Sequence, residues 1–150
     1  MTGSPFSITA TCRDNPQCIF ENEDIIVELS IRNDAPHEVR IPLEFIDQSG
    51  PYCALIDNET GKKITLRVGL PDHLKIEDYV IIKTKETVKM VRRISVSNIR
   101  ATRSEMVDLT AKLTIAGPIQ LHPGAEQVRF RNDIDVRIIG KDKINRDGRL

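Results

Sequence analysis

Apolar and polar residues alternate one by one along much of this chain, and that pattern constrains its fold more than any other feature. Ile25, Val27, Leu29 and Ile31 are separated by mostly polar positions, and the alternation returns without a break from residue 107 to residue 115. A period of two places successive side chains on opposite faces of a β-strand. Apolar residues keep a helical spacing over three turns nowhere in the sequence, so the pattern predicts an all-β chain.

Turn residues divide the alternating stretches. Asn33–Pro36 separates the strand at 25–32 from apolar residues at 39–45, which predicts an antiparallel hairpin. A second hairpin is expected across 53–68, with Gly61 at a position that needs a positive φ. The remaining predicted elements, in chain order, are a connection or short helical turn at 69–78, strands at 79–82 and 88–96 around an exposed turn at 84–86, a strand at 106–115, a loop at 116–124, and a final strand or strand pair at 128–138.

Seven or eight short strands with turn-rich joints predict an antiparallel immunoglobulin-like β-sandwich. A closed barrel is the alternative, because alternation does not distinguish one curved sheet from two stacked sheets. The 150 residues fit one domain, which we expect over 1–139, followed by a charged, flexible tail over 140–150.

The formal net charge of zero hides a strong asymmetry. Residues 1–60 hold three basic and eleven acidic side chains, a net charge of −8, so residues 61–150 carry +8. Seven basic residues against Glu86 alone give residues 83–103 a net charge of +6. Such a run indicates either a surface for an acidic partner or strands of opposite charge that neutralise one another across a sheet.

Three cysteines and a first segment without the layout of a signal peptide predict a cytoplasmic protein. Cys12 and Cys18 flank a turn-like segment, so a bridge between them is geometrically conceivable and stays open at this point. Cys53 is expected to be a small buried hydrophobe.

The sequence gives no reason to expect an enzyme. His37, His73 and His122 lack partners at metal-ligand spacing, and no nucleophile motif is present, so we expect no catalytic residues, no metal and no cofactor. No apolar run is long enough for a membrane helix. The basic stretch has no aromatic side chain for base stacking, which argues against nucleic acid.

Two groups of residues are predicted to contact a partner protein. Ile119, Leu121 and His122 lie between two Gly/Pro pairs, on a loop that either presents them to a partner or folds over the end of the domain as a plug. Lys89, Arg92 and Arg93 form the predicted electrostatic patch, although lysines on an exposed strand also prevent edge-to-edge aggregation.

The order of elements resembles the intracellular proteinase inhibitor family of bacilli. The features that carry the resemblance are the strand at 25–32 with the following Asn33–Pro36 turn, Leu55-Ile56-Asp57, Gly61-Lys62, and Lys85-Glu86-Thr87 before a strand. The resemblance implies an immunoglobulin-like fold and binding to a protease.

These observations predict a non-enzymatic module that binds another protein, in the role of an inhibitor, immunity protein or adaptor. The partner is expected to be acidic, or a protease or toxin. A small-ligand-binding or hydrolytic domain and an oligomeric structural subunit, including a homo-oligomer, are the alternatives.

Overall fold

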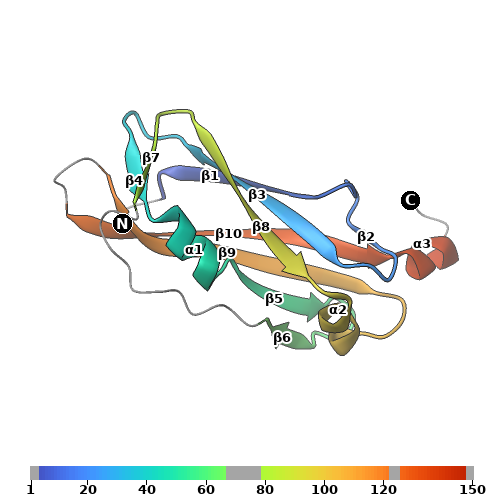
Figure 1. The fold of residues 1–150 in the computed structure, drawn as a ribbon. Coiled ribbons are helices and arrows are strands. Elements are labelled where there is room, and N and C mark those ends of the chain that lie inside the picture. The colour runs from blue at the N-terminus through green and yellow to red at the C-terminus, as the bar shows by residue number, and fades with distance from the viewer. Residues whose placement is uncertain (1–3, 67–78, 122–125, 148–150) are drawn as a thin grey trace.

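The computed structural model describes residues 4–66, 79–121 and 126–147, and most of them lie in β-strands (Figure 1). The prediction of a mainly β chain is therefore confirmed. The strands and helices, in chain order, are β1 (Phe6–Cys12), β2 (Ile19–Phe20), β3 (Ile25–Asn33), β4 (Val39–Ile41), α1 (Leu43–Ser49), β5 (Tyr52–Asp57), β6 (Lys63–Thr65), β7 (Val80–Ile82), β8 (Thr87–Ile94), α2 (Val96–Thr102), β9 (Asp108–Gln120), β10 (Gln127–Gly140) and α3 (Lys141–Asp147).

The strands form two separate sheets and not a closed barrel. One sheet has three antiparallel strands in the order β1-β3-β8. The other runs β2-β10-β9-β4-β7, and β5 pairs with β9 and carries β6. All its pairings are antiparallel except that between β2 and β10, so this sheet is mixed.

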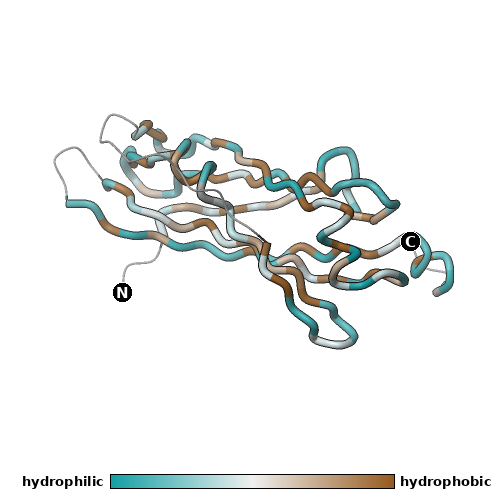
Figure 2. Tube along the Cα trace, turned by 60° about the horizontal axis from the view of Figure 1, so that its bottom comes forward, coloured by the Kyte–Doolittle hydropathy of each residue, from teal (hydrophilic) through white to brown (hydrophobic). Residues whose placement is uncertain are grey.

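The alternation seen in the sequence becomes an inner and an outer face on each sheet, visible as changing colour along the strands in Figure 2. In β3, the residues from Ile25 to Asn33 at every second position are buried. In β9, Leu109, Leu113 and Ile119 are buried in the same way. Buried side chains of both sheets belong to one hydrophobic cluster, so the core lies between them.

The predicted hairpin of residues 25–32 and 39–45 is wrong. β3 pairs with β1 and β8, whereas β4 belongs to the other sheet and pairs with β7 and β9. The turn after β3 carries the chain from one sheet to the other, and the Asn33 amide fixes this crossing by donating to the carbonyl oxygens of His37 and Ile82. Leu43 and Phe45, predicted to continue the second strand, lie in α1.

The predicted hairpin across residues 53–68 is confirmed by the antiparallel pairing of β5 with β6. Gly61 has a φ of 77°, the positive value expected for its place in the turn. The connection predicted for 69–78 lies outside the described residues.

Two predictions about the C-terminal third are wrong. Residues 116–120 continue β9 and pair with β10, so they are not a loop. Residues 141–147 form α3, in which Ile144 is buried and Lys143 bonds to Asp108, so that part of the expected tail is a packed helix. The final strand or strand pair is a single strand, β10.

The two sheets approach each other along one side of the molecule, where β1 runs beside β10. The Asn132 amide donates to the Phe6 carbonyl oxygen at 3.2 Å, and the Phe6 and Phe130 rings meet edge to face with centroids 5.1 Å apart. These contacts cover the Phe6 end of β1, and β8 is the opposite edge of the three-stranded sheet.

Candidate functional site

Strand β8 is an eight-residue edge strand that pairs only with β3 among the described residues. The other edge strand of its sheet, β1, is contacted by β10 through Asn132 and the Phe6–Phe130 ring pair. The edge strands β6 and β7 of the second sheet have three residues each. β8 therefore offers a long, unpaired strand edge, and Figure 1 shows it crossing the front of the molecule.

The backbone of β8 has free hydrogen-bonding groups at every second residue. The Asn33 N–H donates to the Glu86 carbonyl oxygen at 3.0 Å. Because hydrogen-bonded and non-hydrogen-bonded pairs alternate along an antiparallel ladder, this bond identifies the hydrogen-bonded pairs of β3 and β8. Those pairs are Val88, Met90 and Arg92 with their partners in β3. The N–H and C=O groups of Lys89, Val91 and Arg93 consequently point away from β3, toward the open side.

The same residues present their side chains on the outer face of the sheet. Lys89, Val91 and Arg93 are exposed, and Val91 keeps 44% of its surface accessible. Met90 is buried on the inner face, together with Ile94. Each residue with free backbone groups thus also has an exposed side chain, an arrangement that a partner strand can read directly.

Positive charge on this edge is uneven. Arg93 donates from Nε to the Asp24 carboxylate at 2.6 Å, and the Val96 N–H donates to the other oxygen of Asp24 at 2.9 Å. The hydrogen bond from Val96 and that from Arg93 together hold the pKa of Asp24 below its usual range. The C-terminal end of β8 is therefore neutralised.

The N-terminal end of β8 is not neutralised in this way. Lys83, Lys85 and Lys89 are exposed, and no ion pair within 4.0 Å joins any of their ammonium groups to a carboxylate in the part of the chain that the structure describes. Glu86 lies among them and accepts a hydrogen bond from the Lys83 backbone N–H at 3.2 Å. Lys85 occupies the β7–β8 turn with a φ of 69°. We refer to these three lysines as the lysine group.

Arg92 does not join Lys89 and Arg93 in one patch, as predicted, because successive residues of a strand face opposite ways. Its side chain is half-buried on the inner face and interacts with the thiol of Cys53. Burial raises the pKa of Cys53 to about 11 in spite of this arginine. Cys53 is therefore a protonated, buried thiol, in agreement with the sequence.

The predicted contact loop is also not an exposed surface. Ile119 is 1% exposed and lies in the core, and Leu121 is half-buried against it. The alternation of β9 continues through Gly117 and Pro118, whose places in the sequence suggested a turn. His122 lies outside the described residues.

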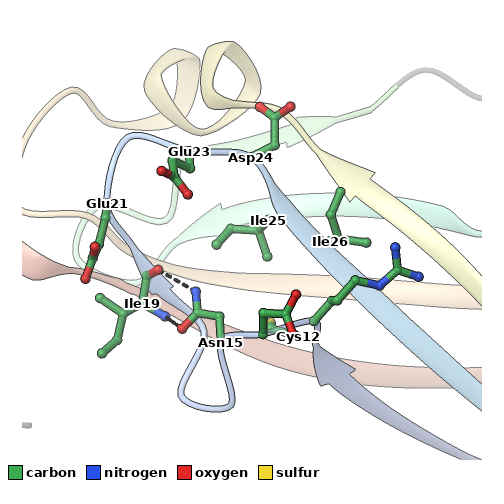
Figure 3. Close-up of a pocket in the computed structure, with 10 residues that line it drawn as sticks. Cys12, Asn15, Ile19, Glu21, Glu23, Asp24, Ile25 and Ile26 are labelled. Carbon is green, nitrogen blue, oxygen red and sulfur yellow. Dashed lines mark hydrogen bonds between the residues drawn. The ribbon is translucent and has the colours of Figure 1, made fainter.

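A cavity of about 340 Å³ lies beside the Cys12–Cys18 segment, which forms a disulfide in this structure (Figure 3). Glu21, Glu23 and Asp24 contribute carboxylates to its rim, and Asp24 turns toward α2, where it binds Val96 and Arg93. In the part of the chain that the structure describes, no three His, Cys, Asp or Glu side chains are grouped to hold a metal ion.

A second polar cluster joins the far end of the large sheet to α3. The Asp108 carboxylate accepts hydrogen bonds from Arg137 Nε and Nη2 at 3.1 and 3.0 Å, from Lys143 Nζ at 2.6 Å, and from the Asn58 amide at 2.9 Å. Burial disfavours ionisation of Asp108, but these bonds outweigh it and hold the pKa of the carboxyl well below its usual range. These four hydrogen bonds occupy both carboxylate oxygens of Asp108, and the one from Lys143 holds α3 against the large sheet.

Comparisons with known proteins supply no identity. No family model and no curated protein matches the sequence. One similar solved structure is described as the X-ray structure of Northeast Structural Genomics Consortium target SoR45; it is 8% identical, with a TM-score of 0.47 over 94% of this chain and 91% of that one. Another, a protein from Archaeoglobus fulgidus, is 14% identical, with a TM-score of 0.39 over 86% and 93% of the two chains. Neither TM-score is high enough to support an argument about fold or function.

Proposed function

We propose that this protein is a non-enzymatic protein-interaction module whose contact element is the open edge of β8. The observation that carries the proposal is an eight-residue edge strand whose outward backbone groups no described element covers. An extended segment of a partner gains affinity by adding a strand to such an edge, because each free N–H and C=O finds a partner. An inhibitor, an immunity protein or an adaptor would each work through such a contact.

We also propose that the two sheets form an immunoglobulin-like β-sandwich. Two sheets that share one hydrophobic cluster support an immunoglobulin-like β-sandwich, and the switch of the chain between sheets after β3 is compatible with it. The resemblance to the intracellular proteinase inhibitor family remains a hypothesis, under which the partner is a protease.

The cytoplasmic location also remains a prediction. No helix within the described residues is long and apolar enough to cross a membrane. The Cys12–Cys18 disulfide instead favours an oxidising compartment, because such bonds persist mainly there.

Site-specific photocrosslinking tests the proposed function. A benzophenone amino acid in place of Lys89 would be irradiated in cells that make the protein naturally, with the same amino acid in place of Lys112 as the control. Lys112 is exposed on β9, on the outer face of the other sheet. We expect a discrete crosslinked protein from position 89 that Val91→Pro abolishes. Identical products from both positions, or none from position 89, would overturn the proposal.

A further inference from the structure

We infer that the segment received by β8 is an extended, antiparallel strand with acidic residues on its C-terminal side, preceded by an apolar residue opposite Val91. The inference rests on the proposed function and names the chemistry of the partner. It follows from three features of the edge: the direction of its free backbone groups, the exposed Val91, and the position of the lysine group.

The backbone sets the spacing of the recognised side chains. Lys89, Val91 and Arg93 direct their free N–H and C=O groups to the open side, so an added strand pairs with every second residue of β8. Its side chains on the outer face then stand opposite the same three residues. The edge therefore recognises the side chains at every second position of the partner strand.

The charge distribution sets the end of β8 at which the acidic residues of the partner lie. The partner is antiparallel because the sheet that it joins is antiparallel throughout and parallel pairing is slightly less stable. The lysine group lies at and before the start of β8, whereas Asp24 already compensates Arg93 near its end. Acidic side chains of the partner are therefore attracted most strongly when they lie opposite Lys89 and beside the β7–β8 turn. An antiparallel partner reaches that end with its C-terminal part, which places its acidic residues after the residue opposite Val91.

Val91 supplies the apolar contact between the two charged ends. With 44% of its surface exposed, it is one of four large hydrophobic residues that stand out on the described surface. Its neighbour across the ladder is Glu28, which is bound to Arg13 at 2.6 Å and leaves the apolar surface of Val91 uncovered. A Val, Ile or Leu on the partner would bury that surface.

A second copy of the same chain fits this edge poorly. Antiparallel self-pairing centred on Val91 would place Lys89 of one copy opposite Arg93 of the other, and this happens twice across the pair. Asp24 already compensates that arginine, so self-pairing would give Lys89 no acidic partner and would leave the lysine group uncompensated in both copies. The charge pattern thus favours a different, acidic chain over a homodimer.

Two synthetic heptapeptides of one composition test the inference. The first, acetyl-Thr-Val-Thr-Glu-Thr-Glu-Thr-amide, has the predicted order, and the second has the reverse order. Isothermal titration calorimetry measures their affinity for the full chain, and amide hydrogen exchange by NMR locates the contact. We expect the first peptide to bind at least about threefold tighter than the second, with slower exchange at Lys89, Val91 and Arg93, and weaker binding as salt is raised.

Three variants of the protein sharpen the test. Lys89→Glu is expected to weaken the first peptide about three- to tenfold, and Lys112→Glu, an equal change of charge on the other sheet, to leave it unchanged. Val91→Pro removes an N–H that points away from β3, so circular dichroism should show a folded protein that no longer binds.

Several outcomes would contradict the inferred chemistry of the partner. Tighter binding of the reversed peptide, equal binding of both, or equal losses in the two Glu variants would overturn the inference. So would dimerisation through β8, detected by light scattering and abolished by Val91→Pro. A crosslinked partner at position 89 together with failure of the acidic peptide would overturn this inference and leave the proposed function standing.

Discussion

The carboxylate of Asp108 shows how one residue at the start of a strand can hold two distant segments together. Its side chain is 6% exposed, and its partners come from β10, α3 and the loop after β5. Lys143 in turn also reaches Glu59, at 3.1 Å. A buried carboxylate with these donors is stable in its charged form, and removing its charge leaves Arg137 without its anionic partner and Lys143 with Glu59 alone.

Replacing Asp108 by Asn should therefore destabilise the protein. We expect a loss of about 1–3 kcal/mol in the free energy of unfolding at pH 7, because Arg137 and Lys143 lose their anionic acceptor while Arg137 stays largely hydrated. Urea denaturation monitored by circular dichroism measures the change. Asp135→Asn, on the exposed face of β10, is the matched control and should change stability by less than about 0.5 kcal/mol. Equal effects of the two substitutions would contradict the assigned role of Asp108.

Single residues of the β8 edge could be found from the sequence only in part. Lys89 and Arg93 stand out through charge density, and the structure leaves both exposed on one face. Arg92 belongs to the opposite face, but the apolar residues of 88–96 fit either register of a strand, so the sequence did not decide which way it points. Val91 was missed for the same reason: nothing local marks an apolar residue as exposed.

At the scale of elements, local patterns predicted strands well and their neighbours poorly. The hairpin of β5 and β6 was predictable because its partners adjoin one another around Gly61. The switch between sheets after β3 was not, because a turn looks alike whether the chain folds back or crosses over. The edge position of β8 was not predictable either, since strand order depends on contacts between segments far apart in the chain.

The position of Ile119 within β9 places its side chain in the core, and not on a surface that a partner could contact. Ile119→Asp should cost about 3 kcal/mol or more, or prevent folding, because it places an unpaired charge in the core. Thermal unfolding and the yield of soluble protein measure the loss. Leu121→Asp, at a half-buried position just after the strand, should cost clearly less. Comparable losses would show that residue 119 is not in the core.

The disulfide joins elements of the two sheets, since Cys12 ends β1 and Cys18 precedes β2, whose partner is β10. Replacing both cysteines by Ser should lower the free energy of unfolding by about 2 kcal/mol, because the disulfide no longer restricts the unfolded chain by closing a short loop. Dithiothreitol should destabilise the wild type to a similar extent and leave the variant unchanged. An effect of dithiothreitol on the variant would show that the reductant acts elsewhere.

At the scale of the whole molecule, folding brings the acidic N-terminal and basic C-terminal parts of the chain together. Salt bridges join Arg93 to Asp24, Arg103 to Asp57 and Glu59, and Lys141 to Glu21. Both interpretations of the charge asymmetry thus apply to different residues: Arg93 and Arg103 of the basic run 83–103 are paired with acidic side chains, and the lysine group is not. The same pairing makes the fold dependent on ionised carboxylates.

Acid should therefore weaken the fold. Hydrogen bonds from Val96 and Arg93 lower the pKa of Asp24, and donors that outweigh burial lower those of Asp57 and Asp108. A carboxyl group whose pKa is lower in the folded state contributes stability above its unfolded pKa of about 4, and that contribution is lost as the pH falls through the folded value. Urea midpoints measured between pH 7 and pH 3 should be constant above about pH 5 and then decline.

The Asp108→Asn variant separates this linkage from general acid denaturation. Because it lacks one of the carboxyl groups with a lowered pKa, its midpoint should lie below that of the wild type at pH 7 and decline less steeply in acid. The difference between the two proteins should shrink steadily below about pH 4, as protons compete for Asp108 in the wild type. A difference that stays constant down to pH 3 would mean that the carboxylate of Asp108 has a similar pKa in the folded and unfolded chains, which would contradict its bonding to Arg137 and Lys143.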